Sequence, residues 1–205
     1  MAAEWRIKVK KLLLVSVIIC DILLCAAAYS ISINHELSDN LLRLHVIANS
    51  SSPKDIAVKF AVRDMINEYI ENKNLSDKTG VYYELNPLTE KINIFLSDNG
   101  IDYQCRLIKT VSYFPAKKYD NIKMPSGKYD CIKATLGNGE GENWWCIAYP
   151  PLCFTEAVTG NLSANGEEKL KERLSDEAYK LIHADSRGYN IRFFAVDLIN
   201  NILNK

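Results

Sequence analysis

The chain has 205 residues, of which 48% are hydrophobic and 24% are charged, an ordinary composition for a folded globular protein. Its 25 basic and 25 acidic side chains leave no formal net charge, which argues against a nucleic-acid-binding protein with its clustered basic excess. This length suits one domain with a sizeable core once a targeting segment has been set aside.

Residues 1–31 form a basic segment followed by an apolar run. Four basic side chains precede residues 12–31, and the run contains small residues up to Ala28. This order is typical of a secretory signal, and the run is also nearly long enough to span a bilayer. Asp21 lies in its middle, where a carboxylate costs about 2.5–3.5 kcal/mol on insertion scales. We therefore predict that residues 32–205 are an exported domain, and that the first segment is either cleaved near Ala28 or kept as a membrane anchor.

After a short tether, the segment LLRLHVIANSSSP predicts a strand that leads into a helix. Apolar and polar side chains alternate over residues 42–47, which is typical of a strand with one buried face and places His45 on the outward face. The small residues that follow indicate a turn. Ser52 is placed to cap a helix whose first turn contains a proline and Asp55, and this helix is expected to end near Asn72.

The rest of the chain predicts further helices and strands in an irregular order. The expected elements are a polar loop over 72–85, a helix over 86–99, a strand over 101–107, a connection over 114–127, strands over 128–137 and 144–149, a helix over 167–183, and a closing strand or strand and helix over 189–199. This order indicates an α/β or α+β fold. We expect a single domain in which about three helices pack on a mixed β-sheet, after an N-terminal signal or anchor helix.

Cysteines in the exported part permit disulfides, because an exported domain meets oxidising conditions. Cys146 and Cys153 flank two consecutive prolines, and we expect these two cysteines to form a bridge rather than remain as buried thiols. A second bridge between Cys105 and Cys131 is left open. The sequence contains no CxxC pair and no Cys/His cluster, so neither a metal nor another cofactor is expected.

The residue types of a serine hydrolase occur around the first strand. His45 would be the base, Ser50 the nucleophile, and Asp55 or Asp64 the orienting acid. Ser50 lacks, however, the G-x-S-x-G turn that holds a nucleophilic serine. Helix capping by Ser52 and turn hydrogen bonds from its neighbours explain the same residues. We therefore predict no catalytic residues, and keep a secreted serine hydrolase that uses Ser50 and His45 as the alternative.

The segment NWWCIAYPPLCF contains two adjacent tryptophans, Trp144 and Trp145. Neighbouring side chains on a strand point to opposite faces, so at most one of the two enters a given core. The other is either covered by another layer or exposed, where tryptophan is a typical binding anchor.

The segments LRLHVIANSSSPKDIAVKFAVRD and NWWCIAYPPLCF, with YFPAKKYDNIKMPSGKYDCIKATLG between them, resemble the stage II sporulation protein R family over roughly residues 40–155. The resemblance implies a signalling protein, not an enzyme. Such a protein is secreted across the forespore membrane into the intermembrane space and activates the membrane-bound aspartic peptidase that processes the sigma-E precursor. Residues 12–31 would carry the chain through the membrane or anchor it there.

We interpret two groups of residues as the surface that this partner contacts. The first group is Arg43, His45, Asn49, Ser50 and Asp64. The second group is Trp144, Trp145, Pro150, Pro151 and Phe154. A third and plainer interpretation of the chain is a membrane-tethered scaffold domain without a signalling role.

Overall fold

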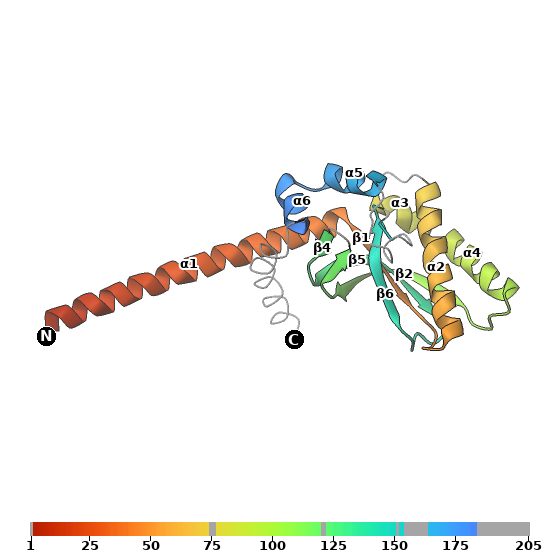
Figure 1. The fold of residues 1–205 in the computed structure, drawn as a ribbon, viewed down its shortest axis with the longest axis horizontal. Helices are drawn as coiled ribbons and strands as arrows, with labels where there is room; N and C mark the ends of the chain where they lie inside the picture. Colours follow the sequence, from red (N-terminus) through yellow and green to blue (C-terminus); the bar gives the residue numbers. More distant parts are fainter. Residues whose placement is uncertain (1, 74–76, 120–121, 151, 154–163, 184–205) are drawn as a thin grey trace.

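The structure is a computed structural model, and it describes residues 2–73, 77–119, 122–150, 152–153 and 164–183 (Figure 1). Pro151, Phe154 and the closing element predicted over 189–199 lie outside these residues.

The centre of the domain is a mixed four-stranded sheet with the strand order β2-β5-β1-β6. The central strand β1 (Leu42–Ile47) runs parallel to β5 (Gly127–Leu136) and antiparallel to β6 (Asn143–Tyr149). The edge strand β2 (Cys105–Phe114) pairs antiparallel with β5. The prediction of an α+β domain with a mixed sheet is confirmed.

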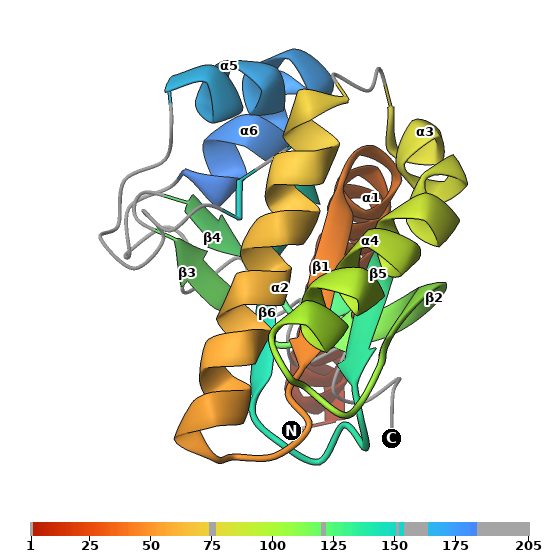
Figure 2. The same ribbon diagram turned by 90° about the vertical axis from the view of Figure 1, so that its right-hand side faces the viewer.

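Three helices cover one face of this sheet, as Figure 2 shows with these helices toward the viewer. They are α2 (Pro53–Asn72), α3 (Lys78–Tyr83) and α4 (Leu85–Asp98). Apolar side chains from alternate positions of β1 and β5 form one cluster with side chains from these helices. Burial of each large aliphatic side chain contributes about 1.5–3 kcal/mol. This packing explains the alternation seen in the sequence of β1.

The second face of the sheet is covered by a different set of elements. They are the end of α1 (Ala2–Asn40), a hairpin of β3 (Lys117–Tyr119) and β4 (Ile122–Met124), and the helices α5 (Ala164–Arg173) and α6 (Asp176–Ile182). Figure 1 shows α1, α6 and β4 on the opposite side of the sheet from α2 and α4. The sheet therefore lies between two layers, and both faces of its central strands contribute to cores.

Helix α1 runs without interruption from the apolar segment into the domain. It is the one helix in the described part of the chain that is long and apolar enough to cross a membrane. Its first large apolar side chains are exposed, whereas Ile33 and Leu37 near its end are buried in the core of the second face. Glu36 accepts hydrogen bonds from the backbone N–H of Ser175 at 2.6 Å and from its hydroxyl at 3.0 Å. The expected tether is therefore a helical part of the domain.

Two predicted connections contain regular structure. The segment 72–85, predicted to be a loop, contains α3, which begins where the Asp77 carboxylate accepts a hydrogen bond from the backbone N–H of Gly80 at 2.9 Å. The connection over 114–127 contains the hairpin of β3 and β4. The prediction missed these elements because each is too short to show a clear hydrophobic period.

Two predicted boundaries also differ from the structure. The helix predicted over 167–183 is divided into α5 and α6, because the Ser175 side chain accepts a hydrogen bond from the backbone N–H of Ala178 and begins a new helix. The strand predicted from Ile101 begins instead at Cys105 and continues to Phe114. Helix α4 begins at Leu85, without the side-chain cap expected from its sequence.

Replacing Leu37 by alanine tests whether α1 is part of the domain core. Leu37 is fully buried, so Leu37→Ala should lower the free energy of unfolding by about 2–5 kcal/mol. The measurement is a urea titration of the full chain in detergent micelles. Leu24→Ala, at an exposed position of the same helix, is the matched control and should leave the stability of the domain unchanged. Equal midpoints for Leu37→Ala and the unmodified chain would contradict this packing.

Candidate functional site

The loop that follows β1 is organised by the carboxylate of Asp55, which is 7% exposed. The side-chain amide of Asn49 donates to this carboxylate at 3.0 Å, and the hydroxyl of Ser50 at 2.6 Å. The phenol of Tyr103 donates to its other oxygen at 2.6 Å. The hydrogen bonds from Ser50 and Tyr103 are the main reason that the pKa of Asp55 is lowered to about 2. The loop is thus held by three donors on one buried anion.

The same loop also holds the turn between β5 and β6. Asn49 Oδ1 accepts a hydrogen bond from the backbone N–H of Asn138 at 3.0 Å. A Cβ at Gly137, where φ is +52°, would collide with the Asn49 side chain, and a Cβ at Gly141 would collide with the backbone of Ser50. Glycine is needed at both positions because the turn and the loop are in close contact.

His45 lies apart from this network, on the second face of the sheet. Its Nε2 forms a 2.7 Å hydrogen bond with Asn143 Oδ1, and its ring stacks on Trp145 with ring centres 5.3 Å apart. Burial lowers the pKa of His45, and the positive charge of Lys133 lowers it further. His45 and Ser50 therefore have separate partners among the described residues, and the arrangement of base and nucleophile needed for serine hydrolysis is not formed.

Arg43 is fully buried, which differs from the outward position that the alternation of β1 predicted. Its guanidinium lies 4.4 Å from the ring centre of Phe114 and 5.0 Å from that of Tyr129. Its Nε donates to the carbonyl of Cys146 at 3.0 Å, and its Nη2 to the hydroxyl of Tyr119 at 3.1 Å. Arg43 is inward because the second face is covered at this position. It supports the site from within and is not part of an exposed surface.

Trp144 and Asp64 lie on the opposite side of the sheet, next to α2. Phe60 packs against Trp144 with ring centres 5.3 Å apart. The Arg63 guanidinium lies 4.7 Å from the Trp144 ring centre, and its Nε donates to Asp64 at 2.8 Å. The two tryptophans thus point to opposite faces, as predicted. The structure brings His45 together with Trp145, and Asp64 together with Trp144 through Arg63.

The turn after β6 is closed by the expected disulfide between Cys146 and Cys153. Within it, the backbone N–H of Leu152 donates to the carbonyl of Ile147 at 3.1 Å, and Pro150 is buried after a cis peptide bond. The Asn67 side-chain amide of α2 donates to the carbonyl of Cys153 at 3.0 Å. Asn67 thereby connects α2 to the end of this turn.

The other two cysteines of the domain, Cys105 and Cys131, are buried free thiols. Burial raises the pKa of Cys105 to about 12, so this thiol is not activated. Within the described ranges, no group of three or more His, Cys, Asp or Glu side chains gathers closely enough to hold a metal ion.

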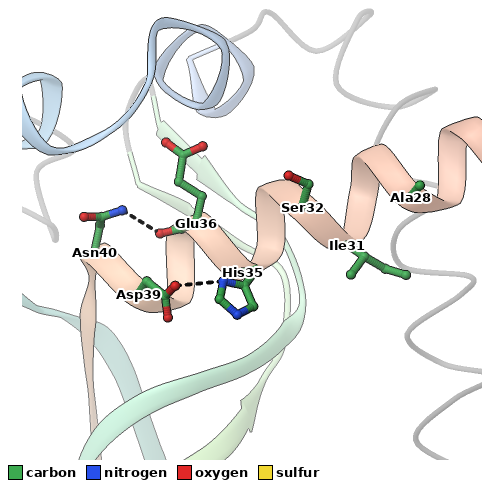
Figure 3. Close-up of a pocket in the computed structure, with 7 residues that line it drawn as sticks. All are labelled: Ala28, Ile31, Ser32, His35, Glu36, Asp39 and Asn40. Atoms are coloured by element: carbon green, nitrogen blue, oxygen red, sulfur yellow. Dashed lines mark hydrogen bonds and ion pairs between the residues drawn. The ribbon is translucent and has the colours of Figure 1, made fainter.

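A separate hollow lies along α1, where it enters the domain (Figure 3). All the residues that line it belong to this one helix: Ala28, Ile31, Ser32, His35, Glu36, Asp39 and Asn40. In Figure 3 His35 and Asp39 lie side by side, and their 2.7 Å ion pair is exposed to solvent. This hollow contains none of the predicted site residues.

Sequence reasoning missed the neighbours that β5 and β2 supply to His45. Strand pairing places Lys133 directly beside His45, and Ile108 beside Lys133. Alternation alone puts Lys133 opposite the buried Ile132, but which strand lies beside which depends on pairing over long sequence distances. These residues therefore had no local signal.

Together these features define an α+β domain, carried on an apolar N-terminal helix, with a partly covered sheet face that presents an aromatic stack. The family model of stage II sporulation protein R matches residues 38–159. The chain belongs to this family, which confirms the resemblance seen in its sequence and supports a role in sporulation signalling. It is 28% identical over 188 residues to stage II sporulation protein R of Bacillus subtilis (strain 168), covering 82% of this chain and 84% of that protein. No solved structure matches the chain.

Replacing Asp55 by asparagine tests the anion at the centre of the loop. Because its pKa in the folded state is about 2, below the ordinary value near 4, the stabilisation is complete above pH 4 and is lost as the pH falls toward 2. At pH 7, Asp55→Asn should lower the free energy of unfolding by about 1–3 kcal/mol.

The difference between Asp55→Asn and the unmodified chain should shrink below about pH 4. Thermal unfolding measured from pH 7 to pH 2.5 would check this, with Asp98→Asn at an exposed position of α4 as the control. A difference that does not change with pH would contradict the assigned role of the charge.

The disulfide should stabilise the domain by restricting the unfolded chain. The two cysteines are 7 positions apart, and a loop this short is worth about 2–3 kcal/mol by the chain-entropy estimate. The double variant Cys146→Ala, Cys153→Ala should therefore unfold at a lower temperature than the unmodified chain. Reductant should lower the unfolding temperature of the unmodified chain but not that of the variant.

Proposed function

We propose that this chain is an exported sporulation signal that activates, by direct contact, the membrane-bound peptidase that processes the sigma-E precursor. Membership of the stage II sporulation protein R family is the observation that carries this proposal. In this proposal the chain is secreted across the forespore membrane into the intermembrane space, with α1 as the signal or anchor. The long apolar helix at the N-terminus supports such an export route.

The contacts of Ser50 and His45 support a ligand rather than a secreted serine hydrolase. Ser50 donates its proton to a carboxylate that already accepts two other side-chain hydrogen bonds, so its hydroxyl has a structural task. His45 is hydrogen-bonded to Asn143 and stacked on Trp145. A general base that activates a serine must lie within hydrogen-bond reach of it. We therefore propose that the chain acts through its shape and surface.

For the surface that contacts the peptidase, we favour the side of the sheet that carries His45 and Trp145. Asn49 and Ser50 shape the neighbouring loop, and Arg43 supports the strand from within. The second predicted group is divided by the sheet: Trp144 and Asp64 flank Arg63 on the α2 side. Pro150 is buried in the disulfide turn. Pro151 and Phe154, which follow it, stay proposals for the same contact.

Ser50→Ala distinguishes the ligand from the hydrolase. In a sporulating host that carries this chain as its only copy, we expect sigma-E precursor processing to continue, because the substitution costs the loop one hydrogen bond, about 1 kcal/mol. A serine hydrolase would lose its nucleophile, and its turnover would fall by several orders of magnitude. Immunoblots of the precursor over time give the measurement. Loss of processing by a variant that is folded and exported would favour the hydrolase.

Removal of residues 12–31 tests export in the same host. The shortened chain should accumulate in the forespore cytoplasm and leave the precursor uncleaved, since the signal cannot reach its partner. Normal processing without this segment would reject the proposed signalling route. Recovery of the peptidase with the full chain after crosslinking would count against a scaffold domain without a signalling role.

A further inference from the structure

One part of the second sheet face has no cover among the described residues. Strand pairing aligns Ile108 of β2, Lys133 of β5, His45 of β1 and Trp145 of β6 in a single row across all four strands. The next row toward the loop end begins with Arg106 and ends with Asn143. We call these six residues the open face: Arg106, Ile108, Lys133, His45, Asn143 and Trp145.

The boundary of the open face is sharp. In the preceding row, Cys131 and Arg43 are 0% exposed and Ile147 is 2% exposed, because α1, α6 and the β3–β4 hairpin pack over them. In the row of the open face, Ile108 is 43% exposed, and His45 is half-buried. In Figure 1, α6, β4 and the end of α1 lie beside the upper half of the sheet, and no labelled element lies beside its lower half on that side.

The charges at the open face have one sign. Lys133 lies in the middle of its row, Arg106 is exposed at the β2 edge, and the ammonium of Lys117 lies 5.7 Å from the Trp145 ring centre. Neither of the two rows contains an acidic residue. In the part of the chain that the structure describes, none of these three cations forms an ion pair. The open face therefore combines apolar and aromatic surface with unneutralised positive charge.

We propose that the open face binds an acidic segment of the partner protein. Carboxylates of this segment pair with Lys133 and Arg106, and an apolar side chain packs on Trp145 and Ile108. This proposal rests on the proposed function and specifies the chemistry of the contact. A segment of protein chain fits the open face better than a flat layer of lipid headgroups, because Lys133 and His45 are half-buried. Only a narrow group that enters the row reaches them.

The test uses the full chain, the membrane peptidase and the sigma-E precursor reconstituted together in vesicles. The measured quantity is the concentration of the chain that gives half-maximal precursor cleavage. The double variant Arg106→Glu, Lys133→Glu should raise this concentration at least about tenfold, because like charges replace complementary ones. Lys171→Glu, which reverses an exposed charge on α5, is the control and should have no effect.

Further variants separate binding from folding. Arg106→Glu alone changes an exposed side chain and should give a smaller shift in the same direction. Lys133→Arg keeps the charge and should retain nearly normal activation. The unfolding temperature of each variant is measured in parallel. A double variant that is unfolded is replaced by Arg106→Glu combined with Lys117→Glu, both at exposed positions.

The outcomes distinguish the two proposals. If the unmodified chain gives no cleavage at any concentration, the proposed function fails. If the unmodified chain activates cleavage and the folded charge-reversed variants activate it equally well, the inference about the open face is overturned. The series is repeated in vesicles of phosphatidylcholine with and without phosphatidylglycerol. An effect of the variants that occurs only with the anionic lipid would assign the open face to lipid headgroups and also overturn the inference.

Discussion

The arrangement of the loop end of this domain depends on a single buried carboxylate, that of Asp55. It accepts side-chain hydrogen bonds from the loop after β1 and from Tyr103, which precedes β2. Asn49 extends this connection to the turn between β5 and β6. Segments distant in sequence are therefore held at one end of the sheet by a charge that burial makes costly to leave unpaired. The serines of this loop are explained by that requirement.

The two layers around the sheet have unequal extents, and this difference produces the candidate surface. Helices α2 and α4 pack along the first face, whereas the elements on the second face cover it only as far as the row of Arg43. Beyond that row, the strands continue without cover, and side chains from four strands become accessible together. The surface that we assign to partner binding is thus a consequence of where the second layer ends. The buried Arg43, held between Phe114 and Tyr129, marks the edge of that layer.

Sequence reasoning succeeded where the physical signal is local. The alternation of β1, the Ser52 cap of α2 and the opposed tryptophans of β6 each depend on neighbouring residues, and the structure contains them. The burial of Arg43 and the row from Ile108 to Trp145 depend on pairing between strands far apart in the chain, which no local pattern specifies. The division at Ser175 was missed because the apolar period continues across it. Catalysis by Ser50 and His45 was a matter of geometry, and their separate partners became visible only in the folded chain.

The continuity of α1 has a mechanical consequence. No flexible linker separates the apolar segment from the domain, since Ile33 is already a core residue. At 1.5 Å of rise per residue, only about 3 Å of helix lies between residue 31 and this first core position. While the apolar segment remains in a bilayer, the domain therefore moves with it as one lever: a tilt of the helix is transmitted directly to the domain, which has no slack to travel. Cutting near Ala28 would release the domain and replace this fixed orientation with free diffusion across the gap.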